Sequence, residues 1–130
     1  MAMTQKLILI DDDLTALDLL DLLFERNGFE VQRFTDGATA MQKLERIDAA
    51  AVVVDLMMPG MDGKACIEEI RARGYNGPII AFTAIDDPEV HVAVQSAGCD
   101  LVLTKPCRPN ELLIYVKDEI EKKTAGIIRN

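Results

Sequence analysis

Short apolar runs recur along this chain, separated by longer segments in which apolar residues return at helical spacing. The first, third and fourth runs are continuously apolar, without alternation between apolar and polar positions. That pattern is typical of strands buried on both faces of a parallel sheet. We therefore predict five strands, at residues 6–10, 30–34, 50–54, 78–82 and 100–104.

The segments between these runs carry the start and stop signals of helices. Asn27 and Gly28 end the first segment, and glycine is the residue that most often follows a helix. In the fourth segment Asp87 is suited to cap a helix, Pro88 fits its first position, and Gly98 follows its end. We predict helices at 14–26, 38–46 and 64–73, one between Pro88 and Gly98, and one that begins near Pro109.

Strict alternation of strands and helices with short connections predicts an α/β fold with right-handed crossovers and helices on both faces of a parallel sheet. Five strands favour the flavodoxin-like (βα)5 doubly wound arrangement, with strand order 2-1-3-4-5 in a single domain. We expect this domain to cover residues 5–123 and residues 124–130 to form a tail. The polar chain from Lys122 onward is expected to fray.

Composition and charge exclude several classes of function. The 130 residues fit one domain, and a net charge of −8 argues against direct nucleic-acid binding, which needs a basic surface. No stretch approaches the about 20 apolar residues of a membrane span. Three cysteines without a CxxC pair indicate reduced thiols, and therefore a cytoplasmic location, more than a disulfide framework or zinc site.

Polar side chains follow four of the predicted strands at the point where each strand ends. Ligands of doubly wound sheets bind outside the carboxyl ends of the strands, at the switch point between strands one and three. Asp11 and Asp12 follow the first of these strands, and Asp55 follows the other. Thr83 and Lys105 end the fourth and fifth strands in the same way. These side chains are therefore expected to meet in one cleft.

Three carboxylates in one cleft repel each other unless a cation joins them. Magnesium prefers oxygen ligands and typically binds one or two carboxylates together with a phosphate oxygen. We expect Asp11, Asp12 and Asp55 to hold Mg²⁺, with the backbone carbonyl of Met57 completing the shell. Lys105 would bring the charge close to balance. Asp13 is expected to be a helix cap or surface acid instead.

A site with this charge balance is suited to receive a phosphoryl group. Phosphoryl transfer requires positioning and charge stabilisation more than covalent help, and a carboxylate can be the acceptor. Asp55 is the expected acceptor because it stands alone at the end of the central strand. Thr83 would donate a hydrogen bond to a phosphoryl oxygen, and Lys105 would pair with another.

The sequences of four segments, in this order, resemble the receiver domain of two-component response regulators. They are Leu7–Asp12, Val52–Gly63 (VVVDLMMPGMDG), Phe82-Thr83-Ala84 and Leu103–Pro106 (LTKP). Each motif alone is weak, but the four at these spacings are specific.

The resemblance implies the partners and roles of these residues. Asp55 would accept phosphate from the phosphohistidine of a sensor histidine kinase or a histidine phosphotransfer protein, and the chain would be no enzyme beyond taking that group from a donor. Asp11 and Asp12 would hold Mg²⁺ with Asp55, Thr83 would reorient as the switch, and the Lys105–Pro106 peptide would be cis. A downstream protein would bind the face of the fourth helix, fifth strand and fifth helix, and a homodimer stays open.

The chain departs from the receiver pattern at two positions. Receivers usually carry Tyr or Phe three positions before the lysine, where this chain has Val102, and commonly Phe after the Lys-Pro pair, where it has Cys107. These changes leave the phosphorylation chemistry untouched, but they bear on how a signal would reach the output face.

Two other functions compete with phosphoacceptance. Asp11-x-Asp13-x-Thr15 matches the DxDxT signature of haloacid-dehalogenase-like phosphatases, although the chain is short for that fold and Asp55 would have no role in it. A binding module of receiver fold that is never phosphorylated is the other.

Met57 and Ile85 are apolar where a polar side chain would orient an attacking water, so we expect an aspartyl phosphate in this chain to hydrolyse slowly.

Overall fold

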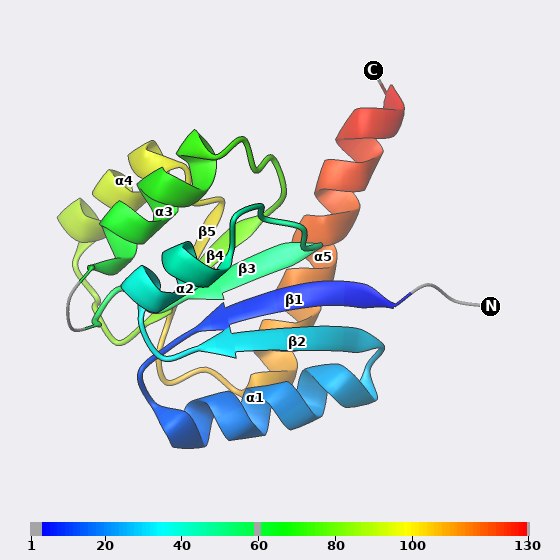
Figure 1. The fold of residues 1–130 in the computed structure, drawn as a ribbon, viewed down its shortest axis with the longest axis horizontal. Coiled ribbons are helices and arrows are strands. Elements are labelled where there is room, and N and C mark those ends of the chain that lie inside the picture. Colours follow the sequence, from blue (N-terminus) through cyan, green and yellow to red (C-terminus); the bar gives the residue numbers. More distant parts are fainter. Residues whose placement is uncertain (1–3, 59–60, 130) are drawn as a thin grey trace.

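The computed structural model describes residues 4–58 and 61–129, with side chains as far as residue 126. Pro59 and Gly60, which belong to the motif segment Val52–Gly63, lie outside the described residues. Within the described ranges, strands and helices alternate strictly (Figure 1). In chain order they are β1 (Gln5–Ile10), α1 (Leu14–Arg26), β2 (Phe29–Phe34), α2 (Gly37–Lys43), β3 (Ala51–Val54), α3 (Gly63–Ala72), β4 (Ile79–Thr83), α4 (Pro88–Ala97), β5 (Leu101–Thr104) and α5 (Pro109–Arg129).

All strand pairs of the sheet are parallel, and the strand order is β2-β1-β3-β4-β5. This confirms the predicted doubly wound topology. Helices α1 and α5 cover one face of the sheet, and α2, α3 and α4 cover the other (Figure 1). The switch point lies between β1 and β3, where the predicted site residues are.

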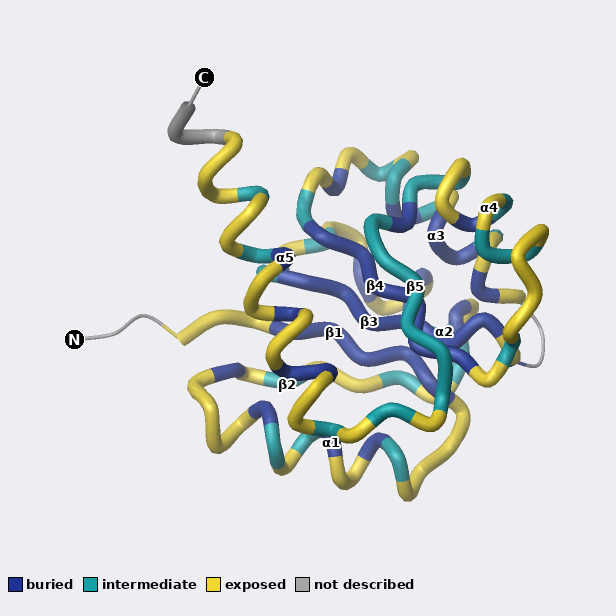
Figure 2. Tube along the Cα trace, turned by 180° about the vertical axis from the view of Figure 1, so that it is seen from behind, coloured by how far each residue is buried: buried dark blue, intermediate teal, exposed yellow. Residues whose placement is uncertain are grey.

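Each face of the sheet has its own apolar core. Successive residues of β1 alternate between the two cores: Leu7 and Leu9 pack with α1 and α5, whereas Ile8 and Ile10 pack with α2 and α3. All four are essentially inaccessible to solvent. Figure 2 shows the central strands as the buried layer between outer helices whose far sides are exposed. Continuous apolar runs therefore mark strands covered on both faces, as predicted.

Aspartates cap the amino ends of the first four helices. Asp13, Asp36, Asp62 and Asp87 each accept a hydrogen bond from a backbone N–H in the first turn of the helix that follows. These bonds satisfy donors that have no partner inside a helix. At the other end of α4, Gly98 has φ of 124°, a conformation that a residue with a Cβ rarely adopts. The start and stop signals read for this helix are thus confirmed.

Helix α2 ends earlier than predicted, at Lys43 instead of Arg46. Leu44 leaves the helical conformation and buries its side chain in the core. Its carbonyl oxygen accepts a hydrogen bond from Arg73, which follows α3. The end of α2 is therefore fixed by a contact between distant parts of the chain, which the local sequence does not encode.

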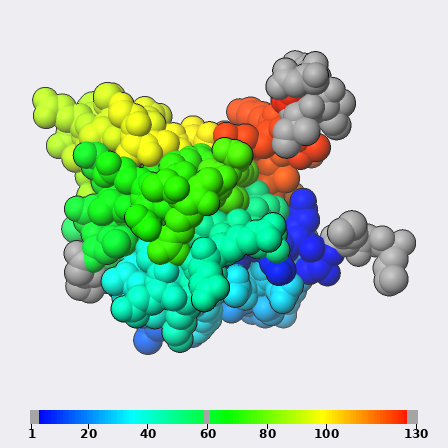
Figure 3. All heavy atoms as spheres, turned by 45° about the horizontal axis from the view of Figure 1, so that its top comes forward, coloured from blue at the N-terminus to red at the C-terminus, as the bar shows by residue number. Residues whose placement is uncertain are grey.

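The prediction that the chain frays from Lys122 onward is wrong, because α5 continues to Arg129 and extends beyond the sheet (Figure 1). The described atoms near the carboxyl end of α5, in orange and red, lie at one side of the molecule in Figure 3. Lys122 pairs with Asp118 one turn earlier at 3.2 Å. Such pairs stabilise the exposed part of a helix, beyond the residues that pack against the core. Lys123 also reaches Asp100, the residue before β5, at 3.1 Å. The proposed tail of residues 124–130 is thus helical as far as the structure describes it.

None of the helices in the described part of the chain combines the length and apolar character needed to cross a membrane.

The three cysteines are free thiols. Cys66 and Cys99 are buried as small apolar residues, and burial raises the pKa of the Cys66 thiol to about 11. A thiol with so high a pKa stays protonated and unreactive near neutral pH.

Arg71 of α3 ties together the edge of the sheet where the strands begin. Its guanidinium donates to the carbonyl oxygens of Tyr75 and Gly77 before β4, each at 2.8 Å. It also donates to the carbonyl oxygen of Gly98 and, at 2.9 Å, to the carboxylate of Asp100, both of which precede β5. One half-buried side chain thus links α3 to the starts of two strands.

We expect Arg71→Met to lower the free energy of unfolding by about 2–4 kcal/mol, because it removes the charged donor of three carbonyl groups and leaves the carboxylate of Asp100 with Lys123 as its cationic partner. Urea unfolding followed by circular dichroism measures this change. The matched control is Arg46→Met, at an exposed position. Equal stability of the two variants would contradict the structural role given to Arg71.

Candidate functional site

The predicted site residues lie together at the carboxyl edge of the sheet, and backbone hydrogen bonds between strands fix three of them. The amide of Asp11 donates to Phe34 at the end of β2, at 3.1 Å. The amide of Asp55 donates to Ile10 at the end of β1, at 2.8 Å, and that of Lys105 donates to Thr83, at 2.7 Å. The sheet ladder therefore continues one residue past each strand and sets where these side chains start.

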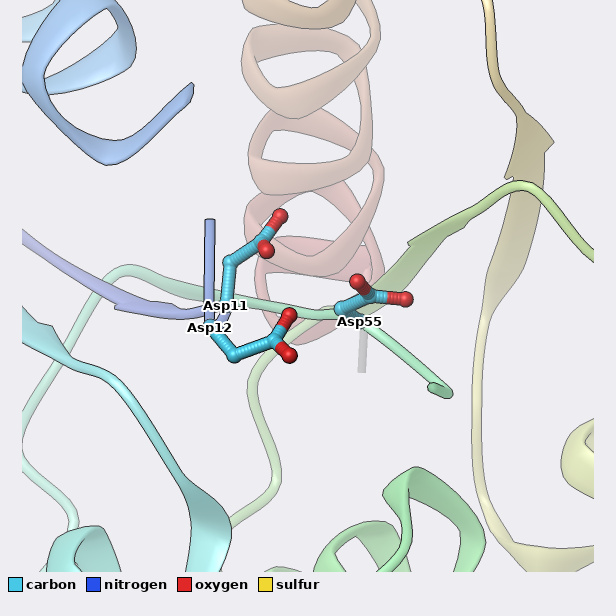
Figure 4. A group of neighbouring side chains, drawn as sticks. All are labelled: Asp11, Asp12 and Asp55. Atoms are coloured by element: carbon cyan, nitrogen blue, oxygen red, sulfur yellow. The ribbon is translucent and has the colours of Figure 1, made fainter. Parts of the chain in front are cut away.

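Asp11, Asp12 and Asp55 form one acidic cluster. Each offers a carboxylate oxygen, and these three oxygens all lie within 4.8 Å of one another. Asp11 and Asp55 are buried, and Asp12 is exposed. Figure 4 shows the side chains of Asp11 and Asp12, which follow β1, lying beside that of Asp55, which follows β3. A cluster of oxygen donors that is partly open to solvent fits a hard divalent cation such as Mg²⁺, which keeps several waters.

Lys105 brings a positive charge into this cluster. Its Nζ lies 2.9 Å from Oδ2 of Asp11 and 3.6 Å from Oδ2 of Asp55. Burial disfavours the charged ammonium, but the hydrogen bond and charge of Asp11, together with the charge of Asp55, outweigh burial and raise the pKa of Lys105. The ammonium is therefore charged at neutral pH and stands between the acids of two strands.

Asp55 lies in a less polar environment than an ordinary surface acid. Burial raises its pKa, and the charge of Asp11 adds to that effect. The backbone N–H of Met57 donates to Oδ1 of Asp55 at 3.0 Å and, with the charge of Lys105, acts in the opposite direction. Burial has the larger effect. The carboxylate is therefore poorly solvated and held by few donors, a favourable condition for a nucleophile or metal ligand.

Thr83 connects the site to α4 through a short series of contacts that the sequence did not reveal. Its buried hydroxyl accepts a hydrogen bond from the backbone N–H of Ile85 at 3.2 Å. The carbonyl oxygen of Ile85 lies 2.7 Å from Nε2 of His91 on α4. His91 is the single histidine of the chain, and it contacts the loop that leads from Thr83 to α4.

The segment after β5 has the geometry that the resemblance implied. The Lys105–Pro106 peptide is cis. Val102, at the position where receivers usually carry an aromatic residue, is half-buried and packs against the core beneath α3 and α4. Cys107 is only partly exposed, and its thiol lies near the carboxylate of Glu111. Neither replacement contacts the acidic cluster through a described hydrogen bond or ion pair.

Gly63, the first residue of α3, allows a close approach behind Asp55. A Cβ atom at this position would lie 2.7 Å from the carbonyl oxygen of Asp55 and 2.5 Å from Cα of Leu56. Any other side chain would push these two residues away. In the sequence Gly63 appears only as the last residue of the motif Val52–Gly63, because close packing of backbones leaves no local signal except the glycine itself.

Asp13 is not part of the cluster. Its carboxylate caps α1 by accepting hydrogen bonds from the backbone N–H groups of Thr15 and Ala16, at 3.0 and 3.2 Å. The expectation that it is a cap is confirmed. A phosphatase of the DxDxT type would need this side chain as a catalytic partner of Asp11. The cap bonds instead direct it toward the helix.

Comparison with known proteins agrees with this geometry. Regulatory protein VanRc of Enterococcus gallinarum is 30% identical over 120 residues, which are 92% of this chain and 52% of that protein. The chain thus spans about half the length of the curated relatives that it matches.

Among solved structures, a CheY-like receiver domain protein from Methanospirillum hungatei JF-1 superimposes with a TM-score of 0.89. The match covers 95% of this chain and 98% of that one at 24% identity, and it supports the fold. The receiver domain of sensor histidine kinase PA1611 from Pseudomonas aeruginosa PAO1 is 28% identical, with a TM-score of 0.80 over 91% of this chain and 98% of that one. That structure has a magnesium ion coordinated in the active site cleft.

Residues 7–117 match the family described as the response regulator receiver domain. The match covers β2 to β5 and β1 from residue 7 onward, and it includes Asp11, Asp12, Asp55, Thr83 and Lys105. These findings support neither the phosphatase nor the module that is never phosphorylated. The chain belongs to the receiver domain family of two-component response regulators.

Proposed function

We propose that Asp55 accepts a phosphoryl group from the phosphohistidine of a sensor histidine kinase or a histidine phosphotransfer protein, and that this modification switches the protein contacts of the chain. The observation that carries the proposal is the cluster itself. Three carboxylates from β1 and β3 converge within 4.8 Å, and the Lys105 ammonium lies between two of them.

Asp11, Asp12 and Asp55 are the residues proposed to hold Mg²⁺, together with the backbone carbonyl of Met57. The oxygen donors and their partial exposure fit this ion. The magnesium in the related Pseudomonas receiver supports the same choice. When bound, Mg²⁺ would neutralise charge on the phosphoryl oxygens. The chain supplies the rest of the site from its own side chains.

In the proposed step, a carboxylate oxygen of Asp55 attacks the phosphorus atom as the bond from phosphorus to the donor nitrogen breaks. The electron pair of that bond returns to the imidazole, and the product is an aspartyl phosphate. Lys105 is placed to pair with a phosphoryl oxygen because its Nζ is 3.6 Å from the attacking carboxylate. Thr83 would turn its hydroxyl from the N–H of Ile85 toward another oxygen. The chain would catalyse no other reaction.

The contacts that would change lie on the face formed by α4, β5 and α5. Thr83 leads to α4 through Ile85 and His91, which gives a route from the site to this face. Val92 on α4 and Tyr115 on α5 are large apolar residues exposed on the helices beside β5. We propose that a downstream protein or a second copy of the chain binds here.

The receiver unit is proposed to be residues 5–123, in a cytoplasmic protein with reduced cysteines.

Incubation with acetyl phosphate and Mg²⁺ is expected to add the mass of one phosphoryl group to the intact protein. Asp55→Asn should abolish this gain, and chelation of Mg²⁺ by EDTA should reduce it strongly. Intact-protein mass spectrometry at fixed times measures both. The Asn side chain is nearly isosteric, so circular dichroism can verify that the variant is folded.

The proposal would be wrong if the folded protein took up no phosphoryl group in the presence of Mg²⁺. An adduct that persists in Asp55→Asn but disappears in Asp11→Asn would instead favour Asp11 as the nucleophile, as in the phosphatase reading.

The aspartyl phosphate is expected to last for minutes or longer, because Met57 and Ile85 offer no polar group to orient an attacking water. Met57 is exposed, so Met57→Asn should leave the fold intact. Loss of phosphate should accelerate by about tenfold at most, since an amide orients water without taking its proton. Time courses of mass after removal of acetyl phosphate measure this rate, with Leu22→Asn on α1 as the control. Decay of the unmodified protein within seconds would contradict the expectation.

Phosphorylation is also expected to raise the molar mass in light scattering from one chain to two, if the partner of the α4–β5–α5 face is a second copy. Val92→Ser, which removes exposed apolar area from α4, should then weaken the dimer. Leu22→Ser, a change of similar kind on α1, should not. A monomer under all conditions would reject the homodimer and leave a different protein as the partner.

A further inference from the structure

Phe82 precedes Thr83 on β4, and its side chain is buried on the sheet face that α1 and α5 cover. Its ring also lines a pocket of about 340 Å³ between α1 and the segment that follows β5. Lys105 and Pro106 line the same pocket. The ring therefore lies where the apolar core meets the acidic cluster, although its position in an apolar run indicates only a core residue.

The ammonium of Lys105 lies over this ring, with Nζ 5.0 Å from the ring centroid. The face of an aromatic ring is electron-rich and attracts a cation at this separation, more strongly where water is excluded. The same ammonium is 2.9 Å from Asp11 and 3.6 Å from Asp55. Lys105 thus has three attractive neighbours, and Phe82 is the uncharged one.

The two carboxylates have competing uses in the proposed function. Asp11 is a proposed metal ligand, and the carboxylate of Asp55 would lose its negative charge when it forms an acyl phosphate bond to phosphorus. Either event weakens an ion pair that now holds Lys105. The attraction of the ring does not depend on the state of the carboxylates, because the ring neither titrates nor binds the metal.

We propose that Phe82 is a positioning residue that holds the Lys105 ammonium beside Asp55 while the phosphoryl group is received. The inference deepens the proposed function and rests on it. An aliphatic residue at position 82 would fill the core equally well but would offer no electron-rich face. Aromatic and aliphatic residues at position 82 therefore differ in the electron-rich face that they offer to Lys105, and both fill the core.

The first test compares rates of phosphorylation by acetyl phosphate at saturating Mg²⁺. Phe82→Leu should slow the reaction by about threefold to tenfold, as expected for loss of one cation–ring contact. Phe82→Tyr, which keeps the ring, should restore most of the rate. Ile80→Val is the matched control, because it removes buried volume from the same strand and core but does not touch Lys105. Phe82→Met replaces Phe82→Leu if the latter fails to fold.

A double-mutant cycle with Lys105→Met tests whether the ring acts through the lysine. In that background, Phe82→Leu should leave the remaining rate unchanged. An equal slowing with and without Lys105 would assign Phe82 to core packing and overturn the proposal. A wild-type rate in the Phe82→Leu variant would overturn it as well, while leaving Asp55 as the phosphoacceptor.

The contact itself can be measured without phosphorylation. A ring beneath the ammonium shifts the ε-methylene protons of Lys105 upfield in NMR spectra of protein labelled with ¹³C-lysine. The signal, assigned by its loss in Lys105→Met, should move downfield in Phe82→Leu and stay in place in Ile80→Val. Absence of an upfield shift in the wild-type protein would overturn the proposal. If the wild-type protein takes up no phosphate, the role in phosphorylation fails with the proposed function, and the NMR shift reports on the contact alone.

Discussion

Repulsion among the carboxylates of Asp11, Asp12 and Asp55 is the constraint on which the site depends. Each added negative charge in so small a volume raises the free energy of the folded chain unless donors or cations oppose it. Backbone N–H groups of Asp13 and Met57 donate to Asp11 and Asp55, and Lys105 pairs with both. These donors reduce the repulsion without removing it. The remaining negative charge is suited to a divalent cation and, in the proposed function, would let the cation and Lys105 accommodate a phosphoryl group.

The parallel sheet makes this concentration of charge feasible because it separates the polar residues from the core along the strand axis. Ile10 and Val54 are buried at the ends of β1 and β3, and Asp11 and Asp55 follow at once. Backbone hydrogen bonds of the ladder extend to these aspartates, so the polar side chains are held by the same bonds that align the strands. The stability of the sheet therefore also sets the geometry of the site.

The fold, and the meeting of the candidate site residues at one edge of the sheet, could be predicted from the sequence because their signals are local. A continuous apolar run followed by an acid identifies both a buried strand and its functional end, and Asp87 with Pro88 identifies a helix start. What could not be predicted depends on contacts between distant residues. The end of α2 needs the donor Arg73, and the length of α5 reflects ion pairs of Lys122 and Lys123.

The same limit applies within the site. Phe82 lies on β4 and Lys105 follows the neighbouring strand β5, and their contact depends on the register of the two strands and on the direction of two side chains. His91 is likewise connected to Thr83 through the backbone N–H and carbonyl groups of Ile85. Every residue type except proline carries both groups, so the sequence does not indicate which of them form such contacts. Residue types at the strand ends indicate which groups meet in the site. The contacts of Phe82 and His91 with those groups become visible only in the three-dimensional structure.

The hydrogen bonds of Arg71, at the opposite edge of the sheet, affect how α4 could move. Arg71 joins α3 to the residues that follow α4, and it does so at the edge farthest from the acidic cluster. If the loop after Thr83 is displaced, the amino end of α4 can move while its carboxyl end stays anchored. Such a helix pivots instead of sliding. The largest displacement would then occur at the amino end of α4 and fall toward the anchored end, which favours partners that recognise the orientation of α4 more than its distance from the sheet.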